Sequence, residues 1–327
     1  MTGPLRTVAV RVHEPGGPDA LVVEGLEVPA PGPGQIRLVH EAIGLNFIDT
    51  YHRTGLYPLA LPAIIGSEGA GVVDAVGEGV TDLAVGDPVA YGQSLGAYAG
   101  ARLIGAERVV GLPDHVSAEL AAAAMLKGLT AWYLVRRTHQ VAPGQTVLVH
   151  AAAGGVGSLL CQWASALGAR VLGTAGSAEK AARARGAGCD EVILYRHEDV
   201  AGAVMEHTGG RGVDVVYDGV GAATFEASLA SLAPFGLMAS FGNSSGPVPP
   251  IRLLSLKDRG LYLTRPTLGS HIGTREGLER GASELFTALA DGTLSVTIGR
   301  RFRLEEAAAA HRALEARETV GSTLLMP

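Results

Sequence analysis

Positive charge, cysteine and long apolar runs are scarce in this 327-residue chain, and each shortage excludes a class of protein. Lysine and arginine together number 26 against 32 acidic residues, so the net charge of −6 argues against a nucleic-acid partner. No uncharged apolar run is long enough to span a membrane, and the N-terminus lacks the basic and apolar segments of a secretory signal. We therefore expect a cytoplasmic protein with no nucleic-acid or membrane partner.

Cysteine and histidine are also too sparsely arranged for a metal or disulfide framework. The two cysteines, Cys161 and Cys189, fall in segments expected to be buried helix or helix end, which favours a reducing compartment. The 10 histidines show no HExxH or HxxxH pattern and no cysteine at ligand spacing. The sequence therefore predicts no His/Cys zinc site.

Glycine is unusually frequent in this sequence, and lysine is unusually rare compared with arginine. Glycine accounts for 46 of the 327 residues, roughly twice its average share, which indicates many tight turns and close backbone approaches. Arginine supplies nearly all of the basic charge, and the only lysines are Lys127, Lys180 and Lys257. Lysine is a compact point charge on a flexible stem, so these positions deserve separate consideration. Of the three, Lys257 is the one expected simply at the surface.

The chain changes texture near residues 115–125, where we expect a domain boundary. Before it, short apolar runs alternate with turn clusters rich in Gly, Pro and Asp, which predicts an antiparallel, barrel-like all-β region. Residues 117–138 are rich in helix formers, with Ser117 as a possible N-cap. Beyond them, buried-strand runs alternate with helical segments, which is typical of a doubly wound parallel sheet. The six expected strands lie near residues 145–152, 170–174, 192–195, 213–220, 237–243 and 261–265.

A glycine-rich loop follows the first of these strands. The spacing Ala152-x-Gly154-x-x-Gly157 lies between a strand and a helix, within about 30 residues of βαβ pattern, as a dinucleotide-binding loop requires. Gly154 would allow a pyrophosphate to approach the backbone, and Gly157 would allow the helix to pack against the strand. The N–H groups around Gly155 and Val156 would hold the anion at the helix N-terminus.

The end of the second strand indicates which dinucleotide is bound. An acidic side chain there would bind the ribose 2′-hydroxyl of NAD, but no Asp or Glu is present. Ser177 supplies a hydroxyl and Lys180 an ammonium group at the start of the next helix, which suits a 2′-phosphate. NADP is therefore favoured over NAD, although Lys180 could instead be an ordinary solvated lysine.

Several stretches resemble one family along essentially the whole chain. They are AIGLNFIDTYHRTGLYP (42–58), GSEGAGVV (66–73), MLKGLTAWYLV (125–135), HAAAGGVGSLLCQWASALGA (150–169), VYDGVG (216–221), SFGNSSG (240–246) and LTRP (263–266). These stretches resemble the zinc-free NADPH:quinone oxidoreductases, the zeta-crystallin-like branch of the medium-chain dehydrogenase/reductase superfamily. The resemblance implies a Rossmann doubly wound parallel sheet plus a GroES-like β-barrel domain formed from both chain ends. The expected divisions are 1–122 (catalytic), 123–267 (NADP-binding) and 268–327 (return to the catalytic domain).

The resemblance also identifies the chemistry that the chain lacks. Zinc-dependent relatives place a metal-binding cysteine where this chain has Asn46 and a metal-binding histidine where it has Ser67. Without a Lewis acid to polarise the oxygen, simple alcohols are poor substrate candidates. Asp49 and Glu68 match carboxylates kept beside the metal in relatives, and we expect them to have a structural hydrogen-bonding role here.

A quinone is already electrophilic, so its reduction depends mainly on positioning against the nicotinamide. By family position, Asn46 and Tyr51 line the nicotinamide side of the cleft as catalytic candidates, or they only shape it. A reductase of α,β-unsaturated aldehydes or ketones is the alternative activity. A third hypothesis is a nucleotide-binding protein without catalysis, against whose RNA-binding form the acidic charge argues.

The family positions imply a set of NADPH-binding residues and a homodimer. An edge pairing of the apolar residues 261–263 could form that dimer. Besides Asn46 and the loop residues Gly154, Gly155, Val156 and Gly157, the expected cofactor residues are Lys127, Thr130, Gly176, Ser177, Lys180, Tyr195, Phe241, Gly242, Asn243, Ser244, Thr264, Arg265, Pro266 and Arg317.

Overall fold

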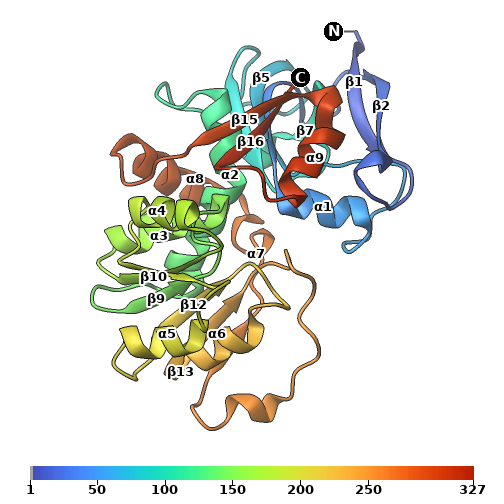
Figure 1. Ribbon diagram of the computed structural model, residues 1–327. Coiled ribbons are helices and arrows are strands. Elements are labelled where there is room, and N and C mark those ends of the chain that lie inside the picture. Colours follow the sequence, from blue (N-terminus) through green and yellow to red (C-terminus); the bar gives the residue numbers. More distant parts are fainter. Residues whose placement is uncertain (1–2) are drawn as a thin grey trace. The chain divides into compact units, whose positions relative to one another are not determined.

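The computed structural model describes residues 3–327 and divides the chain into two compact units (Figure 1). The first unit contains the chain up to Leu129 together with Ile272–Ala290 and Val296–Pro327. The second contains Thr130–His271 and Asp291–Ser295. Residues 1 and 2 of the expected first domain lie outside the described residues.

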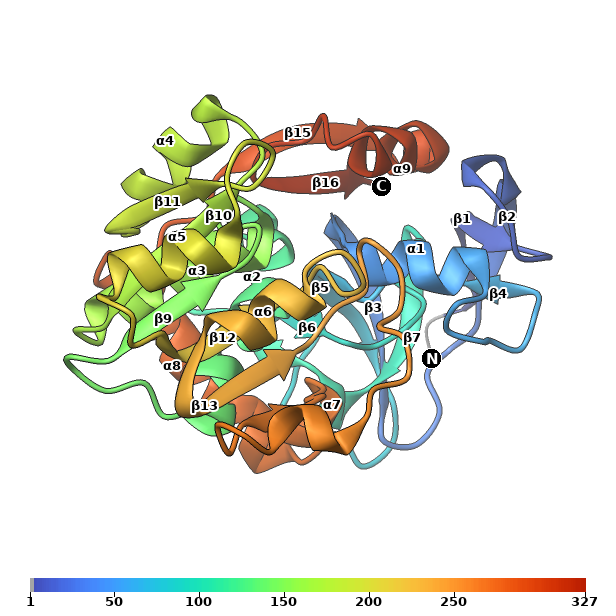
Figure 2. The same ribbon diagram turned by 60° about the horizontal axis from the view of Figure 1, so that its bottom comes forward.

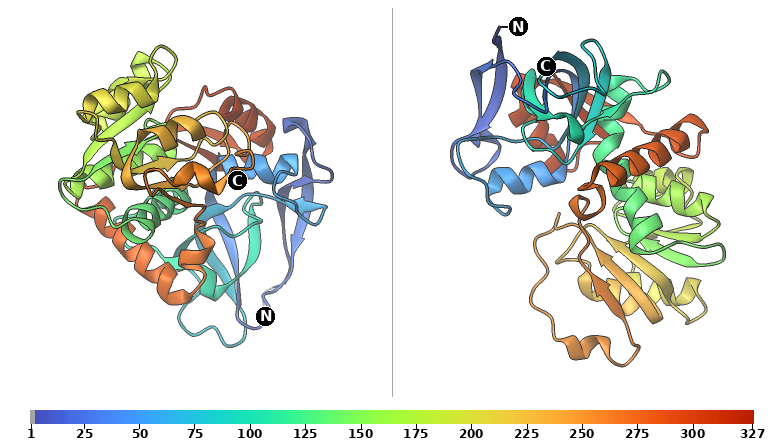
Figure 3. Two further views of the ribbon diagram at one scale, coloured as in Figure 1. Left: turned by 90° about the horizontal axis from the view of Figure 1, so that it is seen from below. Right: turned by 180° about the vertical axis from the view of Figure 1, so that it is seen from behind.

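The first unit is built mainly of antiparallel strands. Its strands are β1 (Leu5–Val12), β2 (Leu21–Val28), β3 (Gln35–Leu45), β4 (Ala63–Ile64), β5 (Glu68–Val76), β6 (Pro88–Gly92), β7 (Ala101–Gly105), β8 (Val110–Gly111), β15 (Ile298–Arg303) and β16 (Ser322–Met326). One sheet has the order β2-β1-β4, and a larger one has the order β15-β16-β3-β5-β6-β8, with β7 also paired to β3. Because β16 pairs antiparallel with β3, the C-terminal end of the chain completes the N-terminal sheet (Figure 3).

The expected antiparallel β region before residue 115 is confirmed, but it is not purely β, because it contains the helix α1 (Phe47–Thr54). The sequence carries the marks of this helix. Asn46 and Asp49 have the spacing of a capping box, and Gly55, with φ 78°, ends the helix in the left-handed conformation. The other helices with residues in this unit are α2 (Ala118–Tyr133), α7 (Gly269–Ile272), α8 (Arg275–Ala290) and α9 (Ala307–Glu315).

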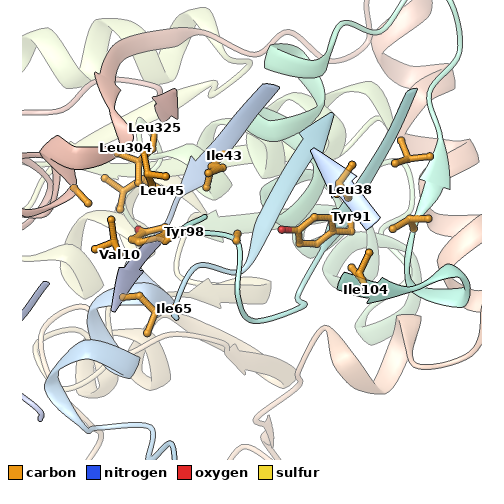
Figure 4. Packing of buried hydrophobic residues seen from close by; sticks show 14 of the residues in the cluster. Val10, Leu38, Ile43, Leu45, Ile65, Tyr91, Tyr98, Ile104, Leu304 and Leu325 are labelled. Atoms are coloured by element: carbon orange, nitrogen blue, oxygen red, sulfur yellow. The ribbon is translucent and has the colours of Figure 1, made fainter. Parts of the chain in front are cut away.

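Apolar side chains from the strands fill the interior of the first unit. Val10, Ile43 and Leu325 come from β1, β3 and β16 and are fully buried in one cluster, which Tyr98 and Leu304 also join (Figure 4). This cluster combines side chains from both ends of the chain, so the C-terminal segment is part of the same core.

The second unit is a six-stranded parallel sheet of order β11-β10-β9-β12-β13-β14, as expected for a doubly wound domain (Figure 2). Its strands are β9 (Thr146–Val149), β10 (Arg170–Ala175), β11 (Glu191–Leu194), β12 (Val213–Asp218), β13 (Leu232–Ser240) and β14 (Tyr262–Thr264). The connecting helices are α3 (Gly155–Ala166), α4 (Ala178–Gly186), α5 (Val200–His207) and α6 (Phe225–Ser231). Buried Val and Leu residues on the strands, such as Leu148 and Val216, form the core.

None of the helices within residues 3–327 is long and apolar enough to cross a membrane.

Candidate functional site

In the first unit, the turn between β3 and α1 fixes the side chain of Asn46. Its Nδ2 donates to Glu68 Oε1 at 2.7 Å and makes a longer contact of 3.4 Å with the Gly44 carbonyl, so the amide nitrogen is held within the unit. Gly44 is required here because a Cβ at this position would overlap the Ala122 carbonyl and the Glu68 carboxylate. The Asn46 amide is consequently oriented by its neighbours before any ligand arrives.

Glu68 is the anchor of this arrangement and is completely buried. Its Oε1 accepts from Lys127 Nζ at 2.6 Å, and its Oε2 accepts from the Leu126 N–H at 2.6 Å. Lys127 is itself only 6% exposed. The buried charges are thus paired, which offsets part of the cost of removing them from water. Lys127, expected from the family at the nicotinamide, makes its ion pair in this unit with Glu68.

Asp49 is a second fully buried carboxylate. It accepts hydrogen bonds from the Asn46 N–H at 2.9 Å, from Ser67 Oγ at 2.8 Å and from Tyr98 Oη at 3.2 Å. Burial raises the pKa of Asp49 to about 7, while the hydrogen bonds from Asn46 and Ser67 act in the opposite direction. These contacts agree with the structural hydrogen-bonding role expected for Asp49 and Glu68.

A hydrogen-bonded chain extends from Asp49 to the C-terminal helix α9. Arg53 Nη1 can only donate, so it donates to His311 Nδ1 at 2.9 Å. In the neutral ring Nε2 then carries the proton and donates to Tyr98 Oη at 2.9 Å. Burial lowers the pKa of His311 to about 3, which keeps the ring neutral, and Arg53 also pairs with Glu315 at 2.6 Å.

The sequence gives no sign of this hydrogen-bonded chain. Its members Arg53, Tyr98 and His311 are far apart along the chain, and none belongs to a motif at recognisable spacing. Tyr51, the other catalytic candidate, lies on α1, with its ring 5.3 Å from the Tyr57 ring in an edge-on arrangement. Among residues 3–327, no three His, Cys, Asp or Glu side chains are grouped as a metal site would require.

In the second unit, the glycine-rich loop forms a tight turn between β9 and α3. Ala151 adopts the left-handed conformation with φ 51°, and its carbonyl accepts from the Gly154 N–H at 2.8 Å. A Cβ on Gly157 would overlap the Ala151 carbonyl, and one on Gly154 would lie 3.0 Å from it. Gly155 and Val156 begin α3, where backbone N–H groups have no partner within the helix. This turn has the open backbone and positive helix end that a pyrophosphate needs.

The expected 2′-phosphate residues lie together at the carboxyl ends of two paired strands. Gly176, Ser177 and Lys180 follow β10, and Tyr195 follows β11, its neighbour in the sheet. The Ser177 hydroxyl caps α4 by accepting from the Lys180 N–H at 3.3 Å, so its own hydrogen remains a donor. At Gly176 a Cβ would lie 2.6 Å from the Tyr195 hydroxyl. None of these four residues carries a carboxylate, and the nearby Glu198 carboxylate accepts from the Leu194 N–H at 2.7 Å.

The remaining expected cofactor residues follow strands or lie outside the sheet. Phe241, Gly242, Asn243 and Ser244 directly follow β13. Thr264 ends β14, and Arg265 and Pro266 follow it. Thr130 belongs to α2, and Arg317, with φ 60°, follows α9 in the first unit. The residues after the parallel strands therefore stand at the sheet edge where such folds bind ligands.

Comparison with known proteins matches both units. The family described as "Alcohol dehydrogenase GroES-like domain" matches residues 32–143, and "Zinc-binding dehydrogenase" matches residues 155–288. The chain is 52% identical to a quinone oxidoreductase of Pseudomonas aeruginosa, over 95% of this chain and 97% of that protein. It is 46% identical to a 2-haloacrylate reductase of a Burkholderia species, over 98% and 99% of the two chains. The Escherichia coli quinone oxidoreductase structure complexed with NADPH superimposes with a TM-score of 0.96 at 46% identity, over 98% of this chain and 100% of that one.

Proposed function

Because the chain belongs to the quinone oxidoreductase family of the medium-chain dehydrogenase/reductase superfamily, we propose that it is an NADPH-dependent quinone reductase. The observation that carries the proposal is that Gly176, Ser177, Lys180 and Tyr195, which follow the paired strands β10 and β11, include no Asp or Glu where NAD-specific folds place one. A hydroxyl donor and an ammonium group suit the 2′-phosphate that distinguishes NADPH from NADH. The turn that would receive the pyrophosphate is tight, because a Cβ on Gly157 would overlap the Ala151 carbonyl and one on Gly154 would lie 3.0 Å from it.

Bound NADPH supplies the hydride that reduces the acceptor. The residues expected to hold it are those that follow the parallel strands β9, β10, β11, β13 and β14, together with Asn46, Lys127, Thr130 and Arg317. Since Glu68 and Gly44 hold the Asn46 amide nitrogen, Oδ1 is the atom through which its side chain would hold a hydroxyl group. Asn46 is therefore a positioning group, and the Tyr51 phenol is the proposed hydrogen-bond donor to the oxygen of the acceptor.

The natural acceptor distinguishes this proposal from its alternative. The 46% identity to a 2-haloacrylate reductase favours an activated C=C bond as a second candidate. Turnover of a naphthoquinone should be compared with that of a 2-alkenal and 2-chloroacrylate at equal NADPH concentration. Faster turnover of the naphthoquinone supports the quinone reductase, whereas turnover of the C=C substrates alone would overturn it.

The cofactor preference is tested at Lys180. Replacing Lys180 with Ala removes the ammonium group, so the KM for NADPH should rise about tenfold or more while that for NADH changes little. Arg183→Ala is the matched control, because Arg183 is an exposed cation one turn further along α4 that pairs with Glu179. Equal effects of Lys180→Ala on both nucleotides would show that Lys180 does not recognise the 2′-phosphate.

We also propose a cytoplasmic homodimer with an NADP-binding domain at 123–267 and a catalytic domain at 1–122 and 268–327. The edge strand β14 supports the dimer, because Tyr262 on it is 61% exposed and Phe235 on β13 is 74% exposed. Sedimentation velocity of the wild type and of Tyr262→Arg tests the proposed dimer. The substitution should convert the dimer to a monomer. Val85→Arg, at an exposed apolar position of the first unit, should leave the dimer intact.

A further inference from the structure

Beneath the glycine-rich turn, the second unit contains a buried polar cluster that the proposed cofactor contacts do not include. His150 follows β9, Thr174 lies on β10, Asp218 ends β12 and Ser228 lies on α6. All four are at most 3% exposed, although three of them are at strand ends where a doubly wound sheet binds ligand. Four polar side chains this deeply buried need partners, and here they are each other's partners.

The hydrogens in this cluster have one consistent direction. The Asp218 carboxylate accepts from Ser228 Oγ at 2.7 Å, so the single Ser228 hydrogen is used there. Ser228 Oγ must then accept from His150 Nε2 at 2.9 Å. With Nε2 protonated in a neutral ring, Nδ1 accepts from Thr174 Oγ1 at 3.2 Å. Burial lowers the pKa of His150, which keeps the ring neutral.

The hydrogen-bonded chain ends at two loops, both at the carboxyl ends of strands in the parallel sheet. At one end Thr174 Oγ1 accepts from the N–H of Ala151 at 3.2 Å, the residue held in the left-handed conformation that opens the pyrophosphate turn. At the other end Asp218 Oδ1 accepts from the N–H groups of Val220 at 2.8 Å and Gly221 at 3.0 Å. The chain therefore joins the turn before α3 to the loop after β12, across the pairing of β9 with β12.

The same directions exclude a nucleophilic role for Ser228. A serine nucleophile gives its proton to an unprotonated histidine nitrogen, whereas here His150 donates to Ser228 and Ser228 donates to the carboxylate. Ser228 also has no exposed surface, so no substrate can reach it. What the chain can do is hold two backbone segments in fixed positions.

We propose that His150, Thr174, Ser228 and Asp218 are positioning residues for NADPH, which act by holding the pyrophosphate turn and the loop after β12 in a binding-ready arrangement. Because all four side chains are buried, they would act through the backbone that they hold. The conformation of the Ala151 turn depends on this chain, since its strained backbone needs a fixed partner for the Ala151 N–H and Thr174 Oγ1 supplies it. The inference rests on the proposed use of NADPH.

The test is the dissociation constant of NADPH, measured by the fluorescence of the bound nicotinamide. Thr174→Val removes the hydroxyl and keeps the side-chain shape, so the dissociation constant should rise about 5- to 20-fold. Thr174→Ser keeps the hydroxyl and should restore affinity to within about twofold of wild type. NADH binding should weaken by the same factor as NADPH binding, because the turn holds the pyrophosphate that both share. Unchanged affinity in a folded Thr174→Val protein would overturn the proposal.

Ser228→Ala has a matched control on the same helix. Ser231 is also a fully buried serine on α6, but its hydroxyl donates only to the Ala227 carbonyl of its own helix. Ser228→Ala should weaken NADPH binding about 5- to 20-fold, and Ser231→Ala should change it less than about twofold. An equal loss in the two variants would show that any buried hydroxyl of α6 matters, which would overturn the proposal.

The double variant Thr174→Val/Ser228→Ala tests whether the hydrogen bonds form one chain. If they do, the loss in the double variant should stay close to the larger single loss instead of reaching the product of both. A product of the two factors would mean independent contacts and would contradict the chain. Absence of NADPH binding in wild type would overturn both the proposed cofactor and this inference. NADPH binding by wild type without quinone turnover would overturn only the proposed reductase.

Discussion

Glu68 and Lys127 show how a single buried pair can determine the conformation of a functional side chain. The Glu68 carboxylate has no exposed surface and accepts from Lys127, from Asn46 and from the Leu126 N–H. Exposed ion pairs contribute little because water screens them, but a buried charge that loses its partner is costly. The orientation of the Asn46 amide consequently depends on the Glu68–Lys127 ion pair.

Glu68→Gln should lower the free energy of unfolding by about 3–5 kcal/mol, because the Lys127 ammonium would remain buried without a counter-charge. The measurement is urea unfolding at pH 7. The double variant Glu68→Gln/Lys127→Met should recover most of the lost free energy of unfolding, since both buried charges are then removed. The control is Glu179→Gln, which breaks an exposed pair with Arg183 on α4 and should cost less than about 0.5 kcal/mol. A double variant as unstable as Glu68→Gln would contradict this account.

At the scale of elements, α3 and its preceding turn pack closely because glycine at position 157 has no side chain. The start of α3 passes so close to the Ala151 carbonyl that only glycine fits at position 157. The helix N-terminus thereby comes directly to the end of β9, where an anion can use its N–H groups. Local backbone approach, more than any polar side chain, makes this element a binding site.

Gly157→Ala should raise the dissociation constant of NADPH at least about tenfold, because the added methyl group forces the turn away from α3. Gly186→Ala is the matched control, since Gly186 also lies in a helix of the second unit but has no atom within 4 Å of an added Cβ. Fluorescence titration of both proteins gives the comparison. Equal binding by Gly157→Ala and wild type would contradict the importance of this close approach.

At the scale of the whole molecule, buried titratable groups make stability depend on pH. Burial lowers the pKa values of His40 and His311 to about 3, so the folded protein keeps both neutral while the unfolded chain protonates below pH 6.5. Their stabilisation is complete above pH 6.5 and is lost as the pH falls toward 3. Asp49 has the opposite sign, because its pKa is raised to about 7, and its contribution is present below pH 3.8 and lost as the pH rises through 7.

His311→Gln isolates one of these contributions. Between pH 7 and pH 5, wild type should lose about 2 kcal/mol more of its free energy of unfolding than the variant does, because the variant has no histidine to protonate on unfolding at this position. Urea unfolding at the two pH values measures the difference. His197→Gln, at an exposed position after β11, should keep the pH dependence of wild type. A His311→Gln protein with the wild-type pH dependence would refute the assignment.

The sequence by itself determined the doubly wound sheet, the glycine-rich turn and the carboxylate-free strand end, because each depends on residues close together along the chain. Strand and helix periodicities are local, and so is the spacing from Ala152 to Lys180. The helix α1 was also within reach, since Asn46, Asp49 and Gly55 mark its two ends.

Only the tertiary structure decided which buried polar groups are partners. His311 meets Arg53 and Tyr98 across more than 200 residues of chain, and Ser228 meets His150 across 78. Such pairs leave no periodicity in the sequence, because hydrogen-bond geometry depends on distances and directions that exist only after the sheets have formed. The same holds for Asn46, since family position predicts it near the nicotinamide but only the structure shows that Glu68 and Gly44 hold its amide nitrogen.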